Sequence, residues 1–448
     1  MFSDNYKRVL VSGMARSGIA AARLLKDHGC DVTCQDLKPA DKIDNASALE
    51  ADGITLYLGK NPDDIIADFD LVVLSPGIST DLPFVEKAKD LGVPVWGEME
   101  LAYRFCPCPI TAVTGTNGKT TTTALIGEIM EAHNHDTAVV GNIGTPFAER
   151  VGRVTADSWV VAEISSFQLE TIQTFRPKIS AVLNVTPDHL DRHKTMERYA
   201  LIKESVGKYQ MPGDFIILNY DDLLCRKMRS RARHVFFSRC EPLYEGFFLK
   251  AGNLHARFNG REFDIVNANR MNIIGNHNIE NALAASAAAI CAGVPVETLR
   301  AALERFKAVE HRIEFVRELN GVRYYNDSKG TNIDSAVKAL EAMKWPVVLI
   351  GGGYDKRADF SEWVTAFKDR VKELIVLGET ADQIAETCHA YGFENIQRVN
   401  TLKDAVYAAS GAARRGDCVL LSPACASWDM FDNYEQRGNM FKDYVFKL

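Results

Sequence analysis

The sequence has no cysteine pair in the C-x-x-C spacing that structural zinc sites and many redox centres use. Its ten cysteines are scattered along the chain, and Cys106-Pro-Cys108-Pro is too closely spaced and too rich in proline for a usual zinc site. Because disulfides are rare in the cytosol, we expect reduced thiols in a cytoplasmic protein.

Long apolar runs and a positive net charge are also missing. No uninterrupted apolar segment reaches the ~20 residues that a membrane-spanning helix needs, and the chain starts without a signal-peptide pattern. The formal net charge of −7 argues against a protein that binds nucleic acid irrespective of sequence. We therefore expect small-molecule partners, no nucleic acid and no membrane span, and we further expect a monomer.

The most informative segment joins an apolar strand at 110–113 to a helix that begins near residue 119. Between them lies a turn of small residues, and Lys119-Thr120 opens the helix. Such a turn presents backbone N–H groups and a helix dipole to phosphate, while the lysine adds charge and the threonine hydroxyl can reach magnesium. The spacing differs from the usual GxxxxGK[ST] because Val113 stands at the first glycine. The alternative is a purely structural turn. The expected nucleotide-contacting residues are Thr114, Gly115, Thr116, Asn117, Gly118, Lys119, Thr120 and Thr121.

The first ninety residues contain a degenerate dinucleotide-type fingerprint. A strand at 8–12 is followed by the glycine turn 13–18, a helix, and a second strand that leads to Asp36. An acid at that place commonly binds a ribose hydroxyl. Ala15 replaces the middle glycine, so glycines that serve only packing are the alternative.

Two further strand ends carry polar side chains. Trp159–Glu163 ends in a carboxylate, and the strand at 179–184 leads to His189. In open α/β sheets, ligands collect at the carboxyl ends of strands, so both groups would meet Lys119 if these strands are neighbours. A solvated strand end and a polar helix start are the respective alternatives.

These patterns predict an α/β protein with three domains. We expect a Rossmann-like domain at 1–97, a central P-loop-type ATPase domain at 98–308 and a C-terminal Rossmann-like domain at 309–448. In the last domain each strand ends in a small-residue turn, and a dense polar run covers 326–332.

Several motifs in this order resemble the ATP-dependent Mur ligases of peptidoglycan synthesis, and Ser75-Pro-Gly-Ile78 with 422–438 is similar to the D-glutamate-adding branch. The motifs are 114–120, 163–168, 275–282, His311-Arg312 and 326–332. The resemblance implies that UDP-N-acetylmuramoyl-L-alanine and D-glutamate are joined through an acyl phosphate while ATP becomes ADP and phosphate.

The resemblance also implies roles for single residues. Thr120 and Glu163 would hold one magnesium ion, and His189 with Lys203, carbamylated by carbon dioxide, a second. A lysine on a helix surface is the alternative for Lys203. The implied catalytic residues are Lys119, His189, Lys203, Arg312 and Lys329.

The remaining implied contacts divide by ligand. Those to ATP include Asn278, Asn281, Arg312 and Asp327. Those to the UDP-sugar are Ser12, Met14, Ala15, Arg16, Asp36, Leu37, Lys38, Ser75, Gly77, Asn142, Ser165 and Gln168. Those to the amino acid are Thr331, Lys356, Ser427, Trp428 and Tyr434. Because the implied ATP contacts fall in two domains, we expect closure about a hinge at 305–310.

Four other functions remain open from the sequence. A sibling ligase that adds another amino acid would share the middle domain but not 422–438. A folylpolyglutamate-type ligase should lack the Rossmann-like opening. An NAD-dependent oxidoreductase would explain 13–36 but leave Lys119, Glu163 and Lys329 without roles, and a non-enzymatic nucleotide-gated scaffold needs no pocket for a dicarboxylate.

Overall fold

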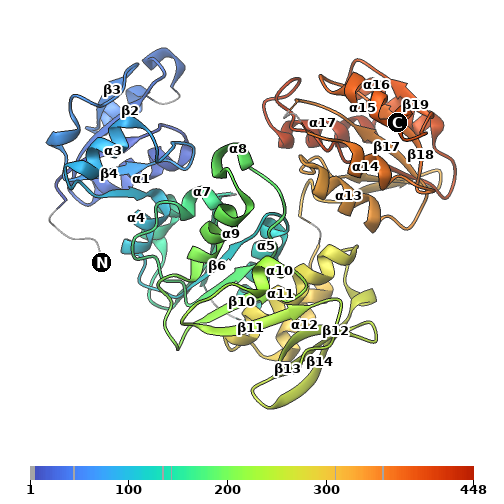
Figure 1. Ribbon diagram of the computed structural model, residues 1–448, viewed down its shortest axis with the longest axis horizontal. Coiled ribbons are helices and arrows are strands. Elements are labelled where there is room, and N and C mark those ends of the chain that lie inside the picture. Colours follow the sequence, from blue (N-terminus) through green and yellow to red (C-terminus); the bar gives the residue numbers. More distant parts are fainter. Residues whose placement is uncertain (1–5, 44–45, 134–135, 143, 308, 356–357) are drawn as a thin grey trace. The chain divides into compact units, whose positions relative to one another are not determined.

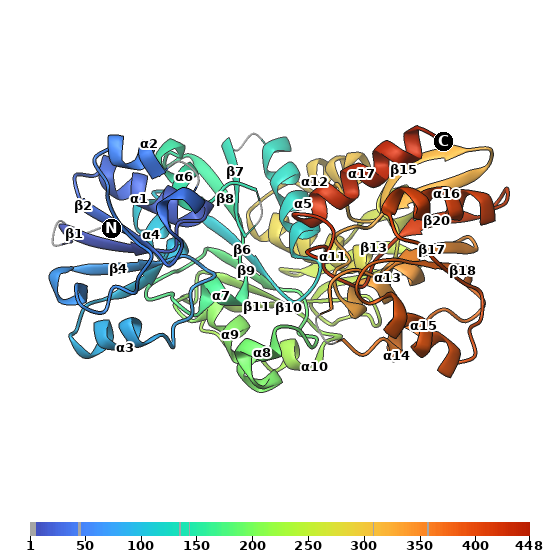
Figure 2. The same ribbon diagram turned by 90° about the horizontal axis from the view of Figure 1, so that it is seen from above.

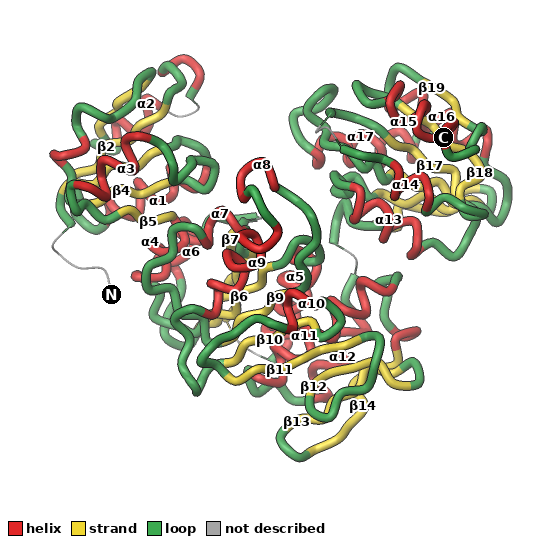
Figure 3. The backbone as a smooth tube through the Cα atoms, in the orientation of Figure 1, coloured by secondary structure: helices red, strands yellow, loops and turns green. Residues whose placement is uncertain are grey.

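The computed structural model describes residues 6–43, 46–133, 136–142, 144–307, 309–355 and 358–448. These residues form three separate sheets of five, nine and six strands, each accompanied by helices (Figures 1 and 3). The chain clusters into two compact units, Met1–Val266 with Asn281–Leu303, and Asn267–Glu280 with Glu304–Leu448. In the part of the chain that the structure describes, no helix has both the length and the hydropathy needed to cross a membrane.

The first sheet has the parallel order β3-β2-β1-β4-β5. Helix α1 packs on one face and α3 on the other, so the sheet is the middle of three layers. Its strands are β1 (Arg8–Ser12), β2 (Asp31–Asp36), β3 (Thr55–Leu58), β4 (Leu71–Leu74) and β5 (Val95–Gly97). Its helices are α1 (Arg16–Asp27), α2 (Ala46–Ala51) and α3 (Pro83–Asp90).

The second sheet has the order β14-β13-β12-β11-β10-β9-β6-β8-β7. It is parallel from β7 to β12, and β13 then runs antiparallel to β12. The strands are β6 (Ile110–Thr114), β7 (Asp136–Gly141), β8 (Ser158–Glu163), β9 (Ile179–Val182), β10 (Phe215–Asn219), β11 (Arg233–Ser238), β12 (Gly246–Lys250), β13 (Asn253–Phe258) and β14 (Arg261–Asn267). The helices in this stretch are α4 (Glu98–Phe105), α5 (Lys119–Ala132), α6 (Phe147–Arg150), α7 (Ser166–Leu169), α8 (Leu190–His193), α9 (Met196–Glu204), α10 (Leu223–Arg226), α11 (Asn276–Cys291) and α12 (Val296–Arg305).

The third sheet has the order β15-β16-β20-β17-β18-β19, parallel except for β15 against β16. Helices α16 and α17 lie side by side on one face, and α13, α14 and α15 cover the other (Figure 2). The strands are β15 (Glu314–Leu319), β16 (Val322–Asn326), β17 (Val347–Gly351), β18 (Val371–Val376), β19 (Ile396–Arg398) and β20 (Cys418–Leu421). The helices are α13 (Ile333–Ala342), α14 (Ser361–Thr365), α15 (Ala381–Ala390), α16 (Leu402–Ala412) and α17 (Tyr434–Phe446).

The central strands of all three sheets are short apolar runs because helices bury both of their faces. Strands β4, β6, β9, β17 and β20 are buried along their whole length. Strand β6 lies between β8 and β9, which is the neighbour relation that brings the expected polar strand ends to one edge.

Candidate active site

The phosphate loop connects β6 to α5 and depends on two glycines. Gly115 and Gly118 have φ angles of +151° and +83°, which side chains rarely adopt. A Cβ atom on Gly118 would also stand 2.3 Å from Oδ1 of Asn281 on α11, and the Thr122 hydroxyl donates to the same oxygen over 3.2 Å. The loop therefore packs directly against Asn281, one of the expected nucleotide residues.

Asn184, which the sequence analysis did not single out, braces this loop from the end of β9. Its Oδ1 accepts a hydrogen bond from the backbone N–H of Asn117 at 2.8 Å, and its Nδ2 donates to the carbonyl of the same residue at 3.1 Å. Because the Asn184 side chain bonds both the N–H and the carbonyl of Asn117, it fixes the backbone conformation of the loop at that residue. The sequence could have indicated this residue, because Asn184 is a polar residue that follows an apolar strand.

Lys119 and Lys203 meet at one backbone carbonyl. The Lys119 Nζ lies 2.9 Å from the oxygen of Gly115, and the Lys203 Nζ lies 2.8 Å from that oxygen. Lys203 is 1% exposed and its amine lies 4.4 Å from the ring centre of Tyr199. Burial, followed by the charge of Lys119, holds the pKa of Lys203 well below its usual range.

Glu163 is the last residue of β8 and is 2% exposed. Asn142, after β7, donates from Nδ2 to its Oε1 over 3.1 Å and from its backbone N–H to its carbonyl over 2.9 Å. Ser165 and Gln168 form a capping box at the start of α7, with each side chain bonded to the other residue's backbone N–H. These four candidate residues thus come from two neighbouring strand ends.

His189 lies at the start of α8 in a left-handed backbone conformation, with φ of +52°. Its side chain is 44% exposed and its Nε2 lies 3.7 Å from Oδ2 of Asp188. The ring centre is 5.0 Å from that of Phe167 on α7. At this exposure the imidazole is accessible to a ligand.

The turn after β1 is tied to β2 and β4. Asp36 accepts backbone hydrogen bonds from Met14 at 2.8 Å and Lys38 at 3.0 Å, so its carboxylate joins two of the expected UDP-contacting segments. The Ser75 hydroxyl donates to the carbonyl of Gly13 over 2.8 Å. The remaining candidates of this group lie on the same turns, and Leu37 is 63% exposed.

In the second compact unit, Asn278 and Arg312 line one cavity of about 430 Å³. The cavity has both amide and aromatic groups on its wall, which suits a heteroaromatic ring. Its lining residues are Asn272, Ile274, Asn278, Lys307, Arg312, Ile313, Glu314, Phe315 and Tyr325.

Asp327, at the end of β16, is 5% exposed and bonded on both oxygens. Its Oδ2 accepts from the Ser422 hydroxyl at 2.7 Å and its Oδ1 from the backbone N–H of Ile313 at 3.2 Å. Burial raises the pKa of Asp327 to about 7, although these bonds and the charge of Arg312 oppose the rise.

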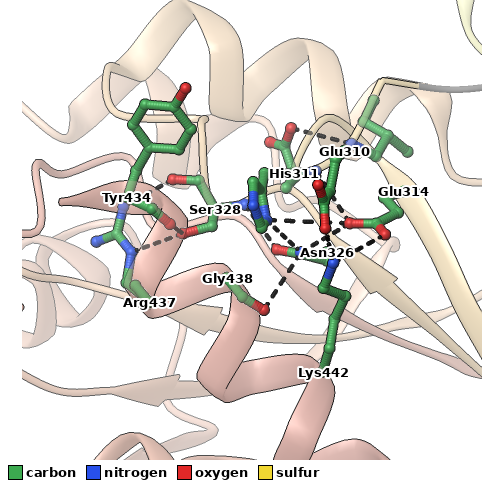
Figure 4. A network of polar contacts seen from close by, with 11 residues as sticks. Glu310, His311, Glu314, Asn326, Ser328, Tyr434, Arg437, Gly438 and Lys442 are labelled. Carbon is green, nitrogen blue, oxygen red and sulfur yellow. Dashed lines mark hydrogen bonds and ion pairs between the residues drawn. The ribbon is translucent and has the colours of Figure 1, made fainter. Parts of the chain in front are cut away.

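Among the expected amino-acid residues, Tyr434 is the first residue of α17 (Figure 4), and Thr331, Ser427 and Trp428 lie on loops. The Lys329 amine lies 5.0 Å from the ring centre of Tyr434, and the Ser328 hydroxyl donates to the Tyr434 carbonyl over 2.8 Å. Ser427 is buried while Trp428 is 63% exposed. Thr331 is half-buried beside Lys329, and Lys356 lies outside the described residues.

The structure thus gathers the candidates into two sets. The first unit holds the phosphate loop with Glu163, Lys203 and Asn281, and also the expected UDP-sugar residues. The second unit holds Asn278 and Arg312 at one cavity, and it also holds Lys329 beside the ring of Tyr434.

A phosphate loop beside a buried carboxylate and a buried lysine is typical of enzymes that transfer a phosphoryl group from a nucleoside triphosphate. Three family models match the chain: a Mur ligase MurD-like N-terminal domain at 7–97, a Mur ligase middle domain at 113–289 and a Mur ligase glutamate ligase domain at 311–425. The chain belongs to the Mur ligase family.

Curated relatives extend over nearly the whole chain. The UDP-N-acetylmuramoylalanine--D-glutamate ligase of Pelotomaculum thermopropionicum is 49% identical and covers 99% of this chain and 98% of its own length. The enzyme of the same name from Lachnospira eligens is 47% identical, with 99% of each chain covered. The predicted resemblance and the prediction of a ligase of this family are confirmed.

Solved structures give the same fold. UDP-N-acetylmuramate-alanine ligase MurC from Thermotoga maritima has a TM-score of 0.62 at 20% identity, with 99% of each chain covered. MurF from Acinetobacter baumannii also reaches 0.62 at 15% identity, covering 97% of this chain and 93% of its own. The predicted fold class, three α/β domains, is confirmed.

Proposed function

We propose that this chain joins D-glutamate to UDP-N-acetylmuramoyl-L-alanine, using ATP, in the synthesis of peptidoglycan precursors. The observation that carries the proposal is the 49% identity, over 99% of the chain, to an enzyme named for this ligation. The phosphate loop, which packs against Asn281, and the buried side chains of Glu163 and Lys203 supply groups that the chemistry requires.

The reaction has two steps. The alanyl carboxylate attacks the γ-phosphorus of ATP, and the bond to ADP breaks to give an acyl phosphate. The amine of D-glutamate then attacks the acyl carbon, loses a proton, and displaces phosphate. Both steps bring negative groups together, so binding and charge neutralisation by Lys119, Arg312 and Lys329 are the main contributions of the protein.

The oxygen donors at the phosphate loop fit magnesium, a hard cation that prefers carboxylate and hydroxyl oxygens. Thr120 and the buried carboxylate of Glu163 would hold one ion, and His189 with a carbamylated Lys203 a second. Magnesium would supply positive charge against the phosphate oxygens. The loop residues Thr114 to Thr121 and Asn281 would bind the phosphates, and Asn278 and Asp327 the nucleoside.

Carbamylation of Lys203 is supported by the state of its amine. An ammonium ion cannot react with carbon dioxide, and burial beside Lys119 lowers the pKa of Lys203 toward a neutral amine. A carbamate would also convert a cationic side chain into an oxygen ligand. The carbonyl of Gly115 holds Nζ at 2.8 Å, which orients the amine toward the phosphate loop.

The two other substrates would bind at the remaining candidate groups. Turns around Asp36 and Ser75 would take the UDP, and Asn142, Ser165 and Gln168 the muramoyl part. Loops that carry Lys329, Thr331, Ser427 and Tyr434 would take D-glutamate, together with Lys356 and Trp428.

We also propose that the domain boundaries fall at 97/98 and 308/309 and that the enzyme is a cytoplasmic monomer. All ten cysteines are free thiols, which supports a reducing compartment.

The hinge at 305–310 stays a proposal, and residue 308 within it lies outside the described residues. Sedimentation at micromolar concentration tests the monomer, and a second, heavier species would contradict it.

The decisive experiment measures phosphate release from ATP and UDP-N-acetylmuramoyl-L-alanine with D-glutamate, L-glutamate, D-alanine or L-lysine as acceptor. We expect release with D-glutamate alone and a product heavier by one glutamyl residue. Release with another acceptor would make the chain a sibling ligase. If no acceptor gives release but UDP-N-acetylmuramate is turned over with L-alanine, the proposal is rejected, and the chain is again a sibling ligase.

A further inference from the structure

The Cys106-Pro-Cys108-Pro turn has no part in the proposed reaction, yet it holds two thiols in contact. The turn joins α4 to β6, and the two Sγ atoms lie 3.5 Å apart. Cys106 is partly exposed, whereas Cys108 is 9% exposed and belongs to the apolar core. The more exposed residue of the pair is therefore Cys106, and its sulfur is in contact with that of the buried Cys108.

The contact also makes the two sulfur atoms chemically different. The side-chain hydrogen bond between the two thiols lowers the pKa of Cys106, while the same contact and burial raise the pKa of Cys108. Burial raises the pKa of Cys34, Cys388 and Cys418. Of the two sulfur atoms, Cys106 is therefore the better placed to attack a disulfide, because its pKa is lowered and that of Cys108 is raised.

We propose that Cys106 and Cys108 form a thiol–disulfide exchange site for small disulfides such as glutathione disulfide. The Cys106 thiolate attacks one sulfur of the small disulfide and releases the first glutathione thiolate. Cys108 then loses its proton to solvent and attacks the Cys106 sulfur, which releases the second. Two protein thiols become one disulfide, and one glutathione disulfide becomes two glutathiones. Rotation of the side chains must bring the sulfur atoms to about 2 Å.

Peptide mass spectrometry of the full chain after incubation with glutathione disulfide tests this site. We expect the peptide that contains both residues to lose two hydrogens, while exposed Cys240 carries a glutathione adduct. Cys108→Ser should stop at a stable adduct on Cys106, and Cys106→Ser should leave Cys108 unmodified. A persistent adduct on Cys106 of the wild type, or no reaction there while Cys240 reacts, would overturn the proposal.

A second observation concerns Arg437, on the first turns of α17, whose side chain is buried at 3% exposure. Its Nε donates to the Ser328 hydroxyl at 3.0 Å, and its Nη2 to the carbonyls of Ser328 at 2.8 Å and Cys425 at 3.2 Å. Its Nη1 donates to the carbonyl of Ala426 at 3.3 Å. Figure 4 shows the guanidinium beside Ser328.

These bonds connect the loops that follow three strands. Ser328 follows β16 and Ala426 follows β20, and the Ala426 carbonyl also accepts from the backbone N–H of Tyr354, after β17, at 3.0 Å. A Cβ on Gly353 would stand 2.3 Å from that carbonyl and 3.3 Å from Nη1. The candidate amino-acid residues Lys329 and Ser427 directly follow Ser328 and Ala426 in the sequence.

We infer that Arg437 is a positioning residue for the amino-acid substrate. This inference rests on the proposed function. All four acceptors in these bonds are neutral oxygens. The planar guanidinium of Arg437 therefore holds the loops at fixed distances by hydrogen bonds rather than by a salt bridge. Three loops held at fixed spacing would keep their cations and hydroxyl groups arranged for two carboxylates.

The test compares two variants. Arg437→Lys keeps the positive charge but loses the planar guanidinium, and Arg437→Gln loses both. We expect about a tenfold rise in KM for D-glutamate in both variants, with KM for ATP within about twofold of the wild type. Arg323→Lys, on β16 and paired with Glu318 at 3.1 Å, is the matched control and should behave as wild type. A normal KM for D-glutamate in Arg437→Lys, or equal rises for every substrate, would overturn the inference.

Hydrogen exchange separates this inference from the proposed function, because it needs no turnover. Amides at 328–331 and 424–427 should exchange faster in Arg437→Lys than in Arg323→Lys. Unchanged exchange there would contradict the positioning role even if the enzyme ligates D-glutamate. Absence of phosphate release by the wild type would reject the function while leaving the exchange result interpretable.

Discussion

At the scale of single residues, the environment decides what a side chain can do. Lys119 and Lys203 both bond to the carbonyl of Gly115, but Lys203 is 1% exposed and sits against Tyr199. Burial penalises the charged form of the amine, so the pKa of Lys203 is well below its usual range. Lys208, five residues further on, is exposed.

Lys203→Ala should lower kcat by at least about a hundredfold, because the proposed carbamate oxygen is lost. Acetate or formate should restore part of the activity by supplying an oxygen ligand, measured as phosphate release. Lys208→Ala is the matched control and should keep full activity. Absence of rescue, together with no carbamate in the mass spectrum of the wild type, would reject the carbamate.

Glu98, at the start of α4, should make the free energy of unfolding depend on pH. It is 1% exposed, its Oε1 accepts from the Ala148 N–H at 2.6 Å, and burial raises its pKa from 4.5 to about 7. The folded state therefore keeps a proton that the unfolded state releases above pH 4.5. The contribution of protonated Glu98 to the free energy of unfolding is therefore fully present below pH 4.5 and is lost as pH rises through about 7.

Glu98→Gln should remove that part of the pH dependence while keeping the acceptor for Ala148. The free energy of unfolding of the wild type should fall relative to the variant between pH 4.5 and 7, by on the order of 3 kcal/mol. Urea unfolding at several pH values measures the difference. Parallel pH curves for the two proteins would show that Glu98 does not titrate in this way.

At the scale of elements, the start of α5 shows why a phosphate loop needs glycine at one place. Gly118 has φ of +83°, and the nearest atom to a Cβ there is Oδ1 of Asn281 at 2.3 Å. Backbone conformation and side-chain space both exclude a larger residue. Gly152 lies in the same unit, exposed, and a Cβ there would meet nothing within 4 Å.

Gly118→Ala should therefore weaken ATP binding by at least about tenfold, since the loop N–H groups are displaced from the phosphates. Gly152→Ala should leave ATP binding unchanged and provides the control. Titration with a fluorescent ATP analogue measures both. Equal affinities in the two variants would mean that the loop tolerates the displacement or does not bind phosphate.

At the scale of the whole molecule, the proposed ATP contacts are divided between two compact units. Lys119 and Asn281 belong to the first, and Arg312 and Asp327 to the second. A residue set divided in this way can act on one ligand only in an arrangement of the two units that lets both contact it, and we propose that ligand binding favours that arrangement.

Small-angle scattering should therefore show a smaller radius of gyration when ATP and UDP-N-acetylmuramoyl-L-alanine are both present. Either substrate alone should have less effect, and Gly118→Ala should reduce the response at the same ATP concentration. An unchanged radius at saturating concentrations of both substrates would contradict closure.

Much of the fold could be predicted because its signals are local. A parallel strand buried on both faces must be a short apolar run, so β6, β8 and β17 were visible in the sequence. The glycine turn before Lys119 was visible because only small residues suit it. Asn184 and Arg437 were not assigned roles, because an amide or a guanidinium acquires its role from partners far away in the chain.

The sequence by itself determined the three α/β segments, the phosphate loop and the family, because each of these depends on residues that are close in the chain. The tertiary structure decided which candidates meet. The order β9-β6-β8 brings Glu163 and Asn184 to the loop, and α9 brings a buried Lys203 to the carbonyl of Gly115, 88 residues away. Burial lowers the pKa of Lys203, and burial is a property of the folded chain rather than of any segment.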